Sequence, residues 1–174
     1  MKSDDLIRGM PGHPTHPPLT DATIGIYTFA TIAGVLSALG IADDAAAKGW
    51  ALGLVIGLAV SAPTALTGLV DWLKIESGTP LKRTATSHLI AMVSATAFFL
   101  IAAIAGYSEG MDGVVGSGSL ILTLIAFGLL TVGGWLGGTI VFVHGMRVLN
   151  LVEEPARRAA SPVPRAEERE AEGT

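Results

Sequence analysis

Long apolar runs separated by short polar segments dominate the pattern of this chain. Four stretches of about 20 residues or more carry no formal charge, and this is the length that a helix needs to cross the hydrocarbon core of a bilayer. From them we predict membrane spans over residues 22–42, 50–72, 85–107 and 119–143. The runs lack the period-two alternation of barrel strands, which disfavours a β-barrel.

The short connections between the runs predict that sequential helices pack side by side. We therefore expect an all-α fold, an integral membrane antiparallel four-helix bundle that occupies residues 21–148 as one domain. A polar N-terminal segment, residues 1–20, precedes the bundle and contains the sequence HPTHP. Residues 149–174 are rich in Pro, Ala and charge, and they predict a disordered tail.

The distribution of Lys and Arg predicts the orientation of the bundle. Ten of the eleven basic residues precede the first span, separate the second from the third, or follow the fourth, whereas Lys48 falls on the other side. By the positive-inside rule, both termini are expected to be cytoplasmic. Trp50 and Tyr107 near the outer ends, and Trp72 near the inner end, suit interfacial aromatic belts.

The composition limits the chemistry that the chain can perform. With no cysteine, it has no disulfide, no thiolate metal site, no cysteine-ligated iron–sulfur cluster and no cysteine nucleophile. Imidazole, carboxylate and thioether groups remain as ligands. No Ser or Thr is visibly placed with a base and an oxyanion site, so the sequence favours a cofactor-binding membrane protein over a stand-alone enzyme.

All four histidines of the chain are expected at the cytoplasmic end of the bundle. His13 and His16 lead into the first span, His88 lies near the start of the third, and His144 closes the fourth. Asp71 ends the second span at the same end. Ionisable groups at membrane depth are costly and usually functional, so this convergence predicts a site.

One interpretation of this cluster is a b-type haem site. Two imidazoles from facing helices, His88 and His144, would bind the iron axially, and glycines on the fourth helix would let the flat macrocycle approach the backbone. At 100° per residue, Gly133 and Gly137 fall on the same line of that helix as His144. Basic side chains at the bundle mouth would meet the propionates or lipid phosphates. The residues predicted to bind the cofactor are His88, His144, Gly133, Gly137, Arg83 and Arg147.

A second interpretation is a bare transition-metal ion. Three or four histidines would bind it, and Asp71 would act as a ligand or orient an imidazole. Because proline restricts its own φ and the conformation of the preceding residue, the HPTHP segment would stay extended and fold over the bundle mouth as a lid. The predicted metal ligands are His13, His16, His88, His144 and Asp71.

A third interpretation involves no cofactor at all. The histidines would satisfy buried polar groups or carry protons, in a membrane scaffold or a small-solute transporter. The glycine pair Gly53 and Gly57 and the GGWLGG run, residues 133–138, would allow close helix packing within one bundle and equally a homo-oligomer. Residue spacing alone does not choose between these interpretations.

The motifs of this chain resemble those of a known family. GHPTHPPLTDATIGIYTF, SAPTALTGLVDW, a histidine at the start of the third span and GGWLGGTIVFVHGMRV are similar to the bacterial membrane domains named domain of unknown function 2231, over residues 12 to 148. The resemblance implies a small multi-pass protein of the bacterial inner membrane, without an established activity.

Some members of that family are joined to a Rieske-type iron–sulfur domain, which implies a link with electron transfer. This chain lacks such a domain, so a redox partner would be a separate protein. Our leading hypothesis is therefore a b-type haem, ahead of a bare metal, in membrane-associated electron transfer. Without histidine at the outer end, a single site is expected. The expected partners are the lipid bilayer, a separate redox protein and a second copy of the chain, and not nucleic acid.

Overall fold

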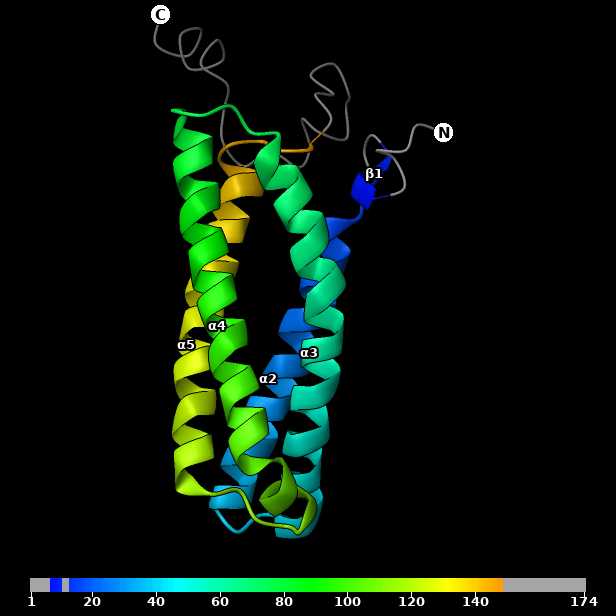
Figure 1. Ribbon diagram of the computed structural model, residues 1–174, viewed down its shortest axis with the longest axis vertical. Coiled ribbons are helices and arrows are strands. Elements are labelled where there is room, and N and C mark those ends of the chain that lie inside the picture. Colours follow the sequence, from blue (N-terminus) through cyan, green and yellow to red (C-terminus); the bar gives the residue numbers. More distant parts are fainter. Residues whose placement is uncertain (1–6, 11–12, 149–174) are drawn as a thin grey trace, which may run out of the picture.

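The computed structural model describes residues 7–10 and 13–148 of the chain. Within this part, four long helices form an antiparallel bundle (Figure 1): α2 (His16–Ala38), α3 (Asp43–Leu73), α4 (Pro80–Met111) and α5 (Ser117–Phe142). Each helix is long and apolar enough to cross a membrane, which confirms the predicted all-α membrane fold. The predicted tail at residues 149–174 lies outside the described residues.

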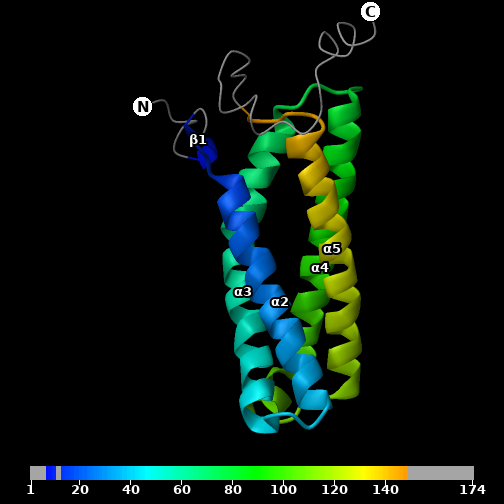
Figure 2. The ribbon, with the colours of Figure 1, turned by 180° about the vertical axis from the view of Figure 1, so that it is seen from behind.

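The helices are arranged as two closely packed pairs, α2 with α3 and α4 with α5, which meet mainly through α3 and α4. The start of α2, the end of α3, the start of α4 and the end of α5 lie together, as Figures 1 and 2 show. We refer to this end of the bundle as the terminal end, and to the other as the opposite end.

A small β-hairpin precedes α2 at the terminal end. Strand β1 (Gly9–Met10) pairs antiparallel with β2 (His13–Pro14), with Met10 opposite His13. The first His-Pro pair is therefore extended, as predicted. The second pair is not: His16 begins α2, because proline fits the first helical turn, where it removes no helical hydrogen bond. The prediction of one continuous extended lid over residues 13–17 is therefore wrong in its second half.

The helices extend beyond the uncharged runs from which they were predicted. Helix α4 begins at Pro80, where Thr79 caps it by accepting a hydrogen bond from the Lys82 backbone N–H at 3.1 Å. His88 therefore lies about 12 Å along the helix from its start, deeper than the sequence predicted from a span that begins at residue 85. Helix α5 ends at Phe142, so the prediction that His144 continues the glycine face of this helix is wrong.

Small side chains fill most of the bundle interior, and this brings the helix backbones close together. The largest buried side chains are aromatic. Tyr27 stacks on Phe99 with ring centres 3.9 Å apart, and the Trp50 indole N–H donates to the Thr123 hydroxyl at 3.0 Å. Trp50 is fully buried, so its prediction as an interfacial residue is wrong.

Large apolar side chains cover the outside of the bundle. Ile104 is 77% exposed, Trp135 75% and Phe142 89%. Such an apolar outer surface would be unstable in water and indicates contact with the lipid bilayer.

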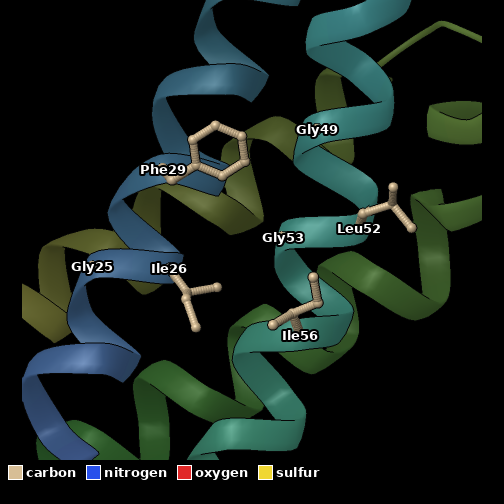
Figure 3. A pocket seen from close by; sticks show the side chains of 7 residues that line it. All are labelled: Gly25, Ile26, Phe29, Gly49, Leu52, Gly53 and Ile56. Carbon is tan, nitrogen blue, oxygen red and sulfur yellow. The ribbon is translucent and has the colours of Figure 1, made fainter.

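A shallow groove of about 390 Å³ also lies on the outer face of α2 and α3 (Figure 3). Glycines form part of its lining, and the other labelled side chains are Ile26, Phe29, Leu52 and Ile56. Gly49 and Gly53 belong to the first turns of α3, so the groove lies towards the opposite end, away from the histidines. An entirely apolar lining offers no ligand to a metal or a haem iron.

Candidate functional site

His16 packs its ring against α3. Its Nδ1 atom lies 3.0 Å from the carbonyl oxygen of Thr64 and 3.2 Å from the hydroxyl of Thr67. Because a carbonyl can only accept, Nδ1 carries the proton and Nε2 the lone pair. The Thr20 hydroxyl lies 3.4 Å from Nε2, but it also donates to the His16 carbonyl at 3.0 Å. The ring is therefore fixed through Nδ1, and Nε2 is the atom through which it would bind a ligand.

Gly68 provides the space for this ring. A Cβ atom added to Gly68 would lie 2.6 Å from Cε1 of His16, too close for any side chain. Asp71 follows one turn later on the same helix, and Trp72 after it. The GxxDW motif at the end of α3 thus begins with a direct contact to the HPTHP motif.

His88 is held in the same way by α5. Its Nδ1 atom lies 2.8 Å from the carbonyl oxygen of Gly133, so Nδ1–H donates and Nε2 has the lone pair. A Cβ atom on Gly137 would lie 3.3 Å from Cε1 of His88, and one on Gly133 would lie 2.5 Å from the sulfur of Met92. The glycines of the GGWLGG run therefore admit two α4 side chains against the α5 backbone.

The two fixed histidines lie near each other, with their ring planes almost perpendicular. The ring centres of His16 and His88 lie 6.4 Å apart, and the ring planes are inclined by 85°. The residues come from α2 and α4, which lie diagonally across the bundle. We refer to His16 and His88 as the histidine pair. It differs from the predicted pair, in which His144 was the partner of His88.

His144 lies beside this pair. It belongs to the turn after α5, and its Nε2 atom is 3.0 Å from the Thr84 hydroxyl. Thr84 is one turn before His88 on α4, so His144 sits between the pair and the terminal end.

Asp71 is buried, and no hydrogen bond joins it to a histidine in the part of the chain that the structure describes. Its carboxylate pairs with Arg8, with Nε 2.6 Å from Oδ1. Arg147 then donates through Nη2 to the backbone carbonyls of Arg8 and Gly9. Asp71 and Arg147 therefore hold the N-terminal hairpin against the bundle, whereas the sequence predicted roles at the cofactor for both.

Segment 143–148 crosses the terminal end from α5 towards the hairpin (Figure 1). Side-chain hydrogen bonds hold it at two places, between His144 and Thr84 and from Arg147 to the carbonyls of Arg8 and Gly9. Gly145 and Arg147 both adopt positive φ, which turns this segment sharply. The segment and the hairpin are therefore linked to each other at the mouth of the bundle.

The remaining predicted residues lie further out. His13 is exposed in β2, and Arg83 is exposed in the first turn of α4. Among residues 7–10 and 13–148, no group of three or more His, Asp or Glu side chains is placed to hold a metal ion. The structure thus brings together two of the five predicted metal ligands, His16 and His88, with ring centres 6.4 Å apart.

The sequence did not single out Arg8 or Thr84, and it carried no local signal for either beyond charge and polarity. The position of His16 did carry a signal, since the following Pro17 and Pro18 are typical of a first helical turn. The polar stripe of Thr64, Thr67 and Asp71 on α3 was visible in the sequence, and it marks the side of the helix that receives His16 and Arg8.

Replacing Asp71 with asparagine should loosen the hairpin without unfolding the bundle. The Arg8–Asp71 pair is partly buried, and its loss should cost on the order of 1 kcal/mol, so hydrogen exchange at the hairpin amides should accelerate about fivefold to tenfold. Hydrogen–deuterium exchange with mass spectrometry measures this over residues 9–15. Asp43→Asn, an exposed residue at the opposite end, is the matched control. Unchanged exchange in Asp71→Asn would contradict the role of this ion pair.

Comparisons with known proteins agree with the fold. A family described as a predicted membrane protein, domain of unknown function 2231, matches residues 12–150 of the chain. No curated protein and no solved structure matches it. The matched region contains all four spanning helices, both members of the histidine pair, and the glycines that pack against them. The chain therefore belongs to the family of predicted membrane proteins named domain of unknown function 2231.

Proposed function

We propose that the histidine pair binds a redox cofactor, a b-type haem in preference to a bare transition-metal ion, and that the protein serves membrane-associated electron transfer. One observation carries this proposal. Two imidazoles from different helices, each fixed by Nδ1–H to a backbone carbonyl, have ring centres 6.4 Å apart and ring planes that are nearly perpendicular. A backbone acceptor on the second ring nitrogen is the usual support of a metal-binding histidine.

The separation of the two rings supports a shared ion. An imidazole nitrogen binds a first-row metal at about 2.0 Å and lies about 1.1 Å from its own ring centre, so two imidazoles on opposite sides of one ion have centres about 6.2 Å apart. The observed value of 6.4 Å is close to this separation.

The small number of protein ligands favours haem over a bare ion. A bare divalent ion usually takes at least three protein ligands, and the described residues offer no such group. A haem supplies four nitrogen ligands of its own and needs only two axial imidazoles. His16 and His88 would hold it. Gly133 and Gly137, which have no side chains, would leave space on α5 for the His88 ring.

The charge distribution supports a cytoplasmic location for the site. Arg8, Lys74, Lys82, Arg83 and Arg147 lie at the terminal end, and Lys48 lies at the opposite end. In a bacterial inner membrane, the positive-inside rule would place the terminal end in the cytoplasm. A separate redox protein would then exchange electrons with the cofactor from that side.

The proposal includes a single site. All four histidines of the chain lie at the terminal end, so the opposite half of the bundle has no imidazole for a second haem. By itself, the chain would then not pass electrons across the bilayer.

The absorption spectrum of the purified protein tests the proposal. Protein isolated in detergent from a producer supplied with haem and iron should show a Soret band, sharpened α and β bands after dithionite, and one haem per chain. Metal analysis of the same sample separates a bare ion from haem. The absence of both a Soret band and a stoichiometric metal would refute the proposal, and two haems per chain would refute the single site.

A second candidate is a scaffold or transporter without a cofactor. It is favoured by the hydrogen bonding, since every fully buried side-chain nitrogen or oxygen in the described part of the chain has a partner. His16 belongs to a row of hydrogen bonds between α2 and α3, which the pairs Thr23–Thr64 and Tyr27–Ser61 continue towards the opposite end. In this case His88→Ala would lower stability and leave the absorption spectrum unchanged.

A further inference from the structure

A second polar feature of the molecule lies at the terminal end, apart from the histidine pair. It is a groove of about 410 Å³ between the loop that joins α3 to α4 and segment 143–148. Arg8, Asp71, Lys74, Thr79, Met146 and Arg147 are among its lining residues. We refer to it as the basic groove.

Two arginines, Arg8 and Arg147, line this groove, although they are 139 residues apart in sequence. Both side chains are held in place by hydrogen bonds that involve Arg8. The Arg147 guanidinium donates to the backbone carbonyl of Arg8, and the Arg8 guanidinium pairs with Asp71. Of the five N–H donors in a guanidinium, Arg8 uses one and Arg147 uses two within the described residues. Counted over these residues, four N–H donors of Arg8 and three of Arg147 are left for an anion.

The charge of the groove favours an anion, because its lining includes three basic residues, Arg8, Lys74 and Arg147, against two acidic ones, Asp71 and Glu76. Asp71 is neutralised by Arg8, with Nε 2.6 Å from Oδ1. Arg147 has no carboxylate partner in the part of the chain that the structure describes, since its contacts there are to backbone carbonyls. A guanidinium paired only with carbonyl oxygens keeps its full charge, and its planar fork matches a phosphate.

The position of the groove indicates a lipid. It lies just beyond Leu73, the last residue of α3, and at the first turn of α4. Next to it, Lys82 lies 3.5 Å above the Trp72 ring and donates to the Trp72 carbonyl, a pairing typical of the membrane interface. Ile75, Leu81 and Met146 add apolar surface to the groove, which suits the glycerol and first methylene groups of a lipid better than a free ion.

We propose that the basic groove binds the phosphate of an anionic phospholipid through the guanidinium groups of Arg147 and Arg8. Basic pockets between spanning helices on the cytoplasmic side are sites for anionic headgroups. This site shares no residue with the histidine pair, so lipid binding can be measured whether or not haem is bound.

Lipid binding to the full chain in mild detergent tests the proposal, with native mass spectrometry to count bound lipids and thermal unfolding to measure their effect. Phosphatidylglycerol should bind as one tightly held lipid per chain and raise the unfolding temperature, and phosphatidylcholine should not. Inorganic phosphate alone should give no comparable shift. Equal responses to the two lipids, or a full response to phosphate, would overturn the proposal.

Substitutions in the basic groove test whether the lipid binds there. Arg147→Gln should weaken phosphatidylglycerol binding at least tenfold, whereas Arg83→Gln, an exposed residue at the same end, should leave it unchanged. Because Arg147 also holds the hairpin, Leu81→Glu provides an independent test: it adds a carboxylate to the groove, removes no hydrogen bond and is compatible with the first turn of α4. It should abolish the phosphatidylglycerol response. Retention of that response in both Arg147→Gln and Leu81→Glu would overturn the proposal.

Discussion

His88→Ala is expected to lose its haem. The substitution removes one of the two proposed axial ligands and also the hydrogen bond to Gly133, 2.8 Å long, that fixes the ring. Even partners that only orient a ligand change metal affinity about 10- to 100-fold, so removal of the ligand itself should lower haem affinity about 100-fold or more. Haem content per chain, measured by absorbance in protein purified in parallel with the wild type, should fall to a small fraction of one.

His16→Ala should have an effect of the same size, because the proposal treats the two residues as equivalent ligands. His13→Ala is the matched control: it removes a histidine from the same HPTHP motif, but the side chain is exposed in β2. Its haem content should equal that of the wild type. His144→Ala should have a smaller effect, because its ring contacts Thr84. Undiminished haem in either His16→Ala or His88→Ala would remove that residue from the site.

Gly57→Ala is expected to destabilise the bundle markedly for so small a change. A Cβ atom at Gly57 would lie 2.5 Å from Cε1 of Tyr27. The Tyr27 ring is fully buried, stacks on Phe99 and forms a hydrogen bond with Ser61 at 3.0 Å, so it cannot move away from the added Cβ atom. Overpacking of this kind costs about 1 to 3 kcal/mol. Thermal unfolding in detergent should therefore occur several degrees lower than in the wild type.

Gly25→Ala is the control for this substitution. Gly25 is also helical and lies on the outer face of α2, where an added Cβ meets no atom within 4 Å. Since alanine favours a helix over glycine by about 1 kcal/mol, the variant should be as stable as the wild type or slightly more so. Gly57→Ala with wild-type stability would show that the Tyr27–Phe99 contact is looser than described.

The fold could be predicted from the sequence because a helix that crosses a membrane needs a long run of apolar residues. Long runs without charge gave four helices and their antiparallel order, and the structure has both. The ends of the helices were harder to predict. A run without charge marks the part of a helix that lies in hydrocarbon, whereas the helix itself extends further, to the cap at Thr79 for α4 and to His16 for α2.

The candidate site could be predicted only in part. Topology brought all the histidines to one end, but the choice of partners depends on how each helix is rotated and on where α5 stops. The end of α5 at Phe142 turned His144 away from the glycine face, and His16 entered the bundle because α2 starts there. Likewise, nothing in the sequence linked Arg8 to Asp71, which are 63 residues apart.

The central claim is that one iron lies between His16 and His88. The electron paramagnetic resonance spectrum of the ferric protein at low temperature tests it directly. We predict a low-spin signal from six-coordinate iron, of the highly anisotropic type that perpendicular axial imidazoles give, because the two ring planes are inclined by 85°. Both His16→Ala and His88→Ala should lose this signal. A high-spin, five-coordinate signal in the wild type, or an unchanged low-spin signal in His16→Ala, would contradict the account.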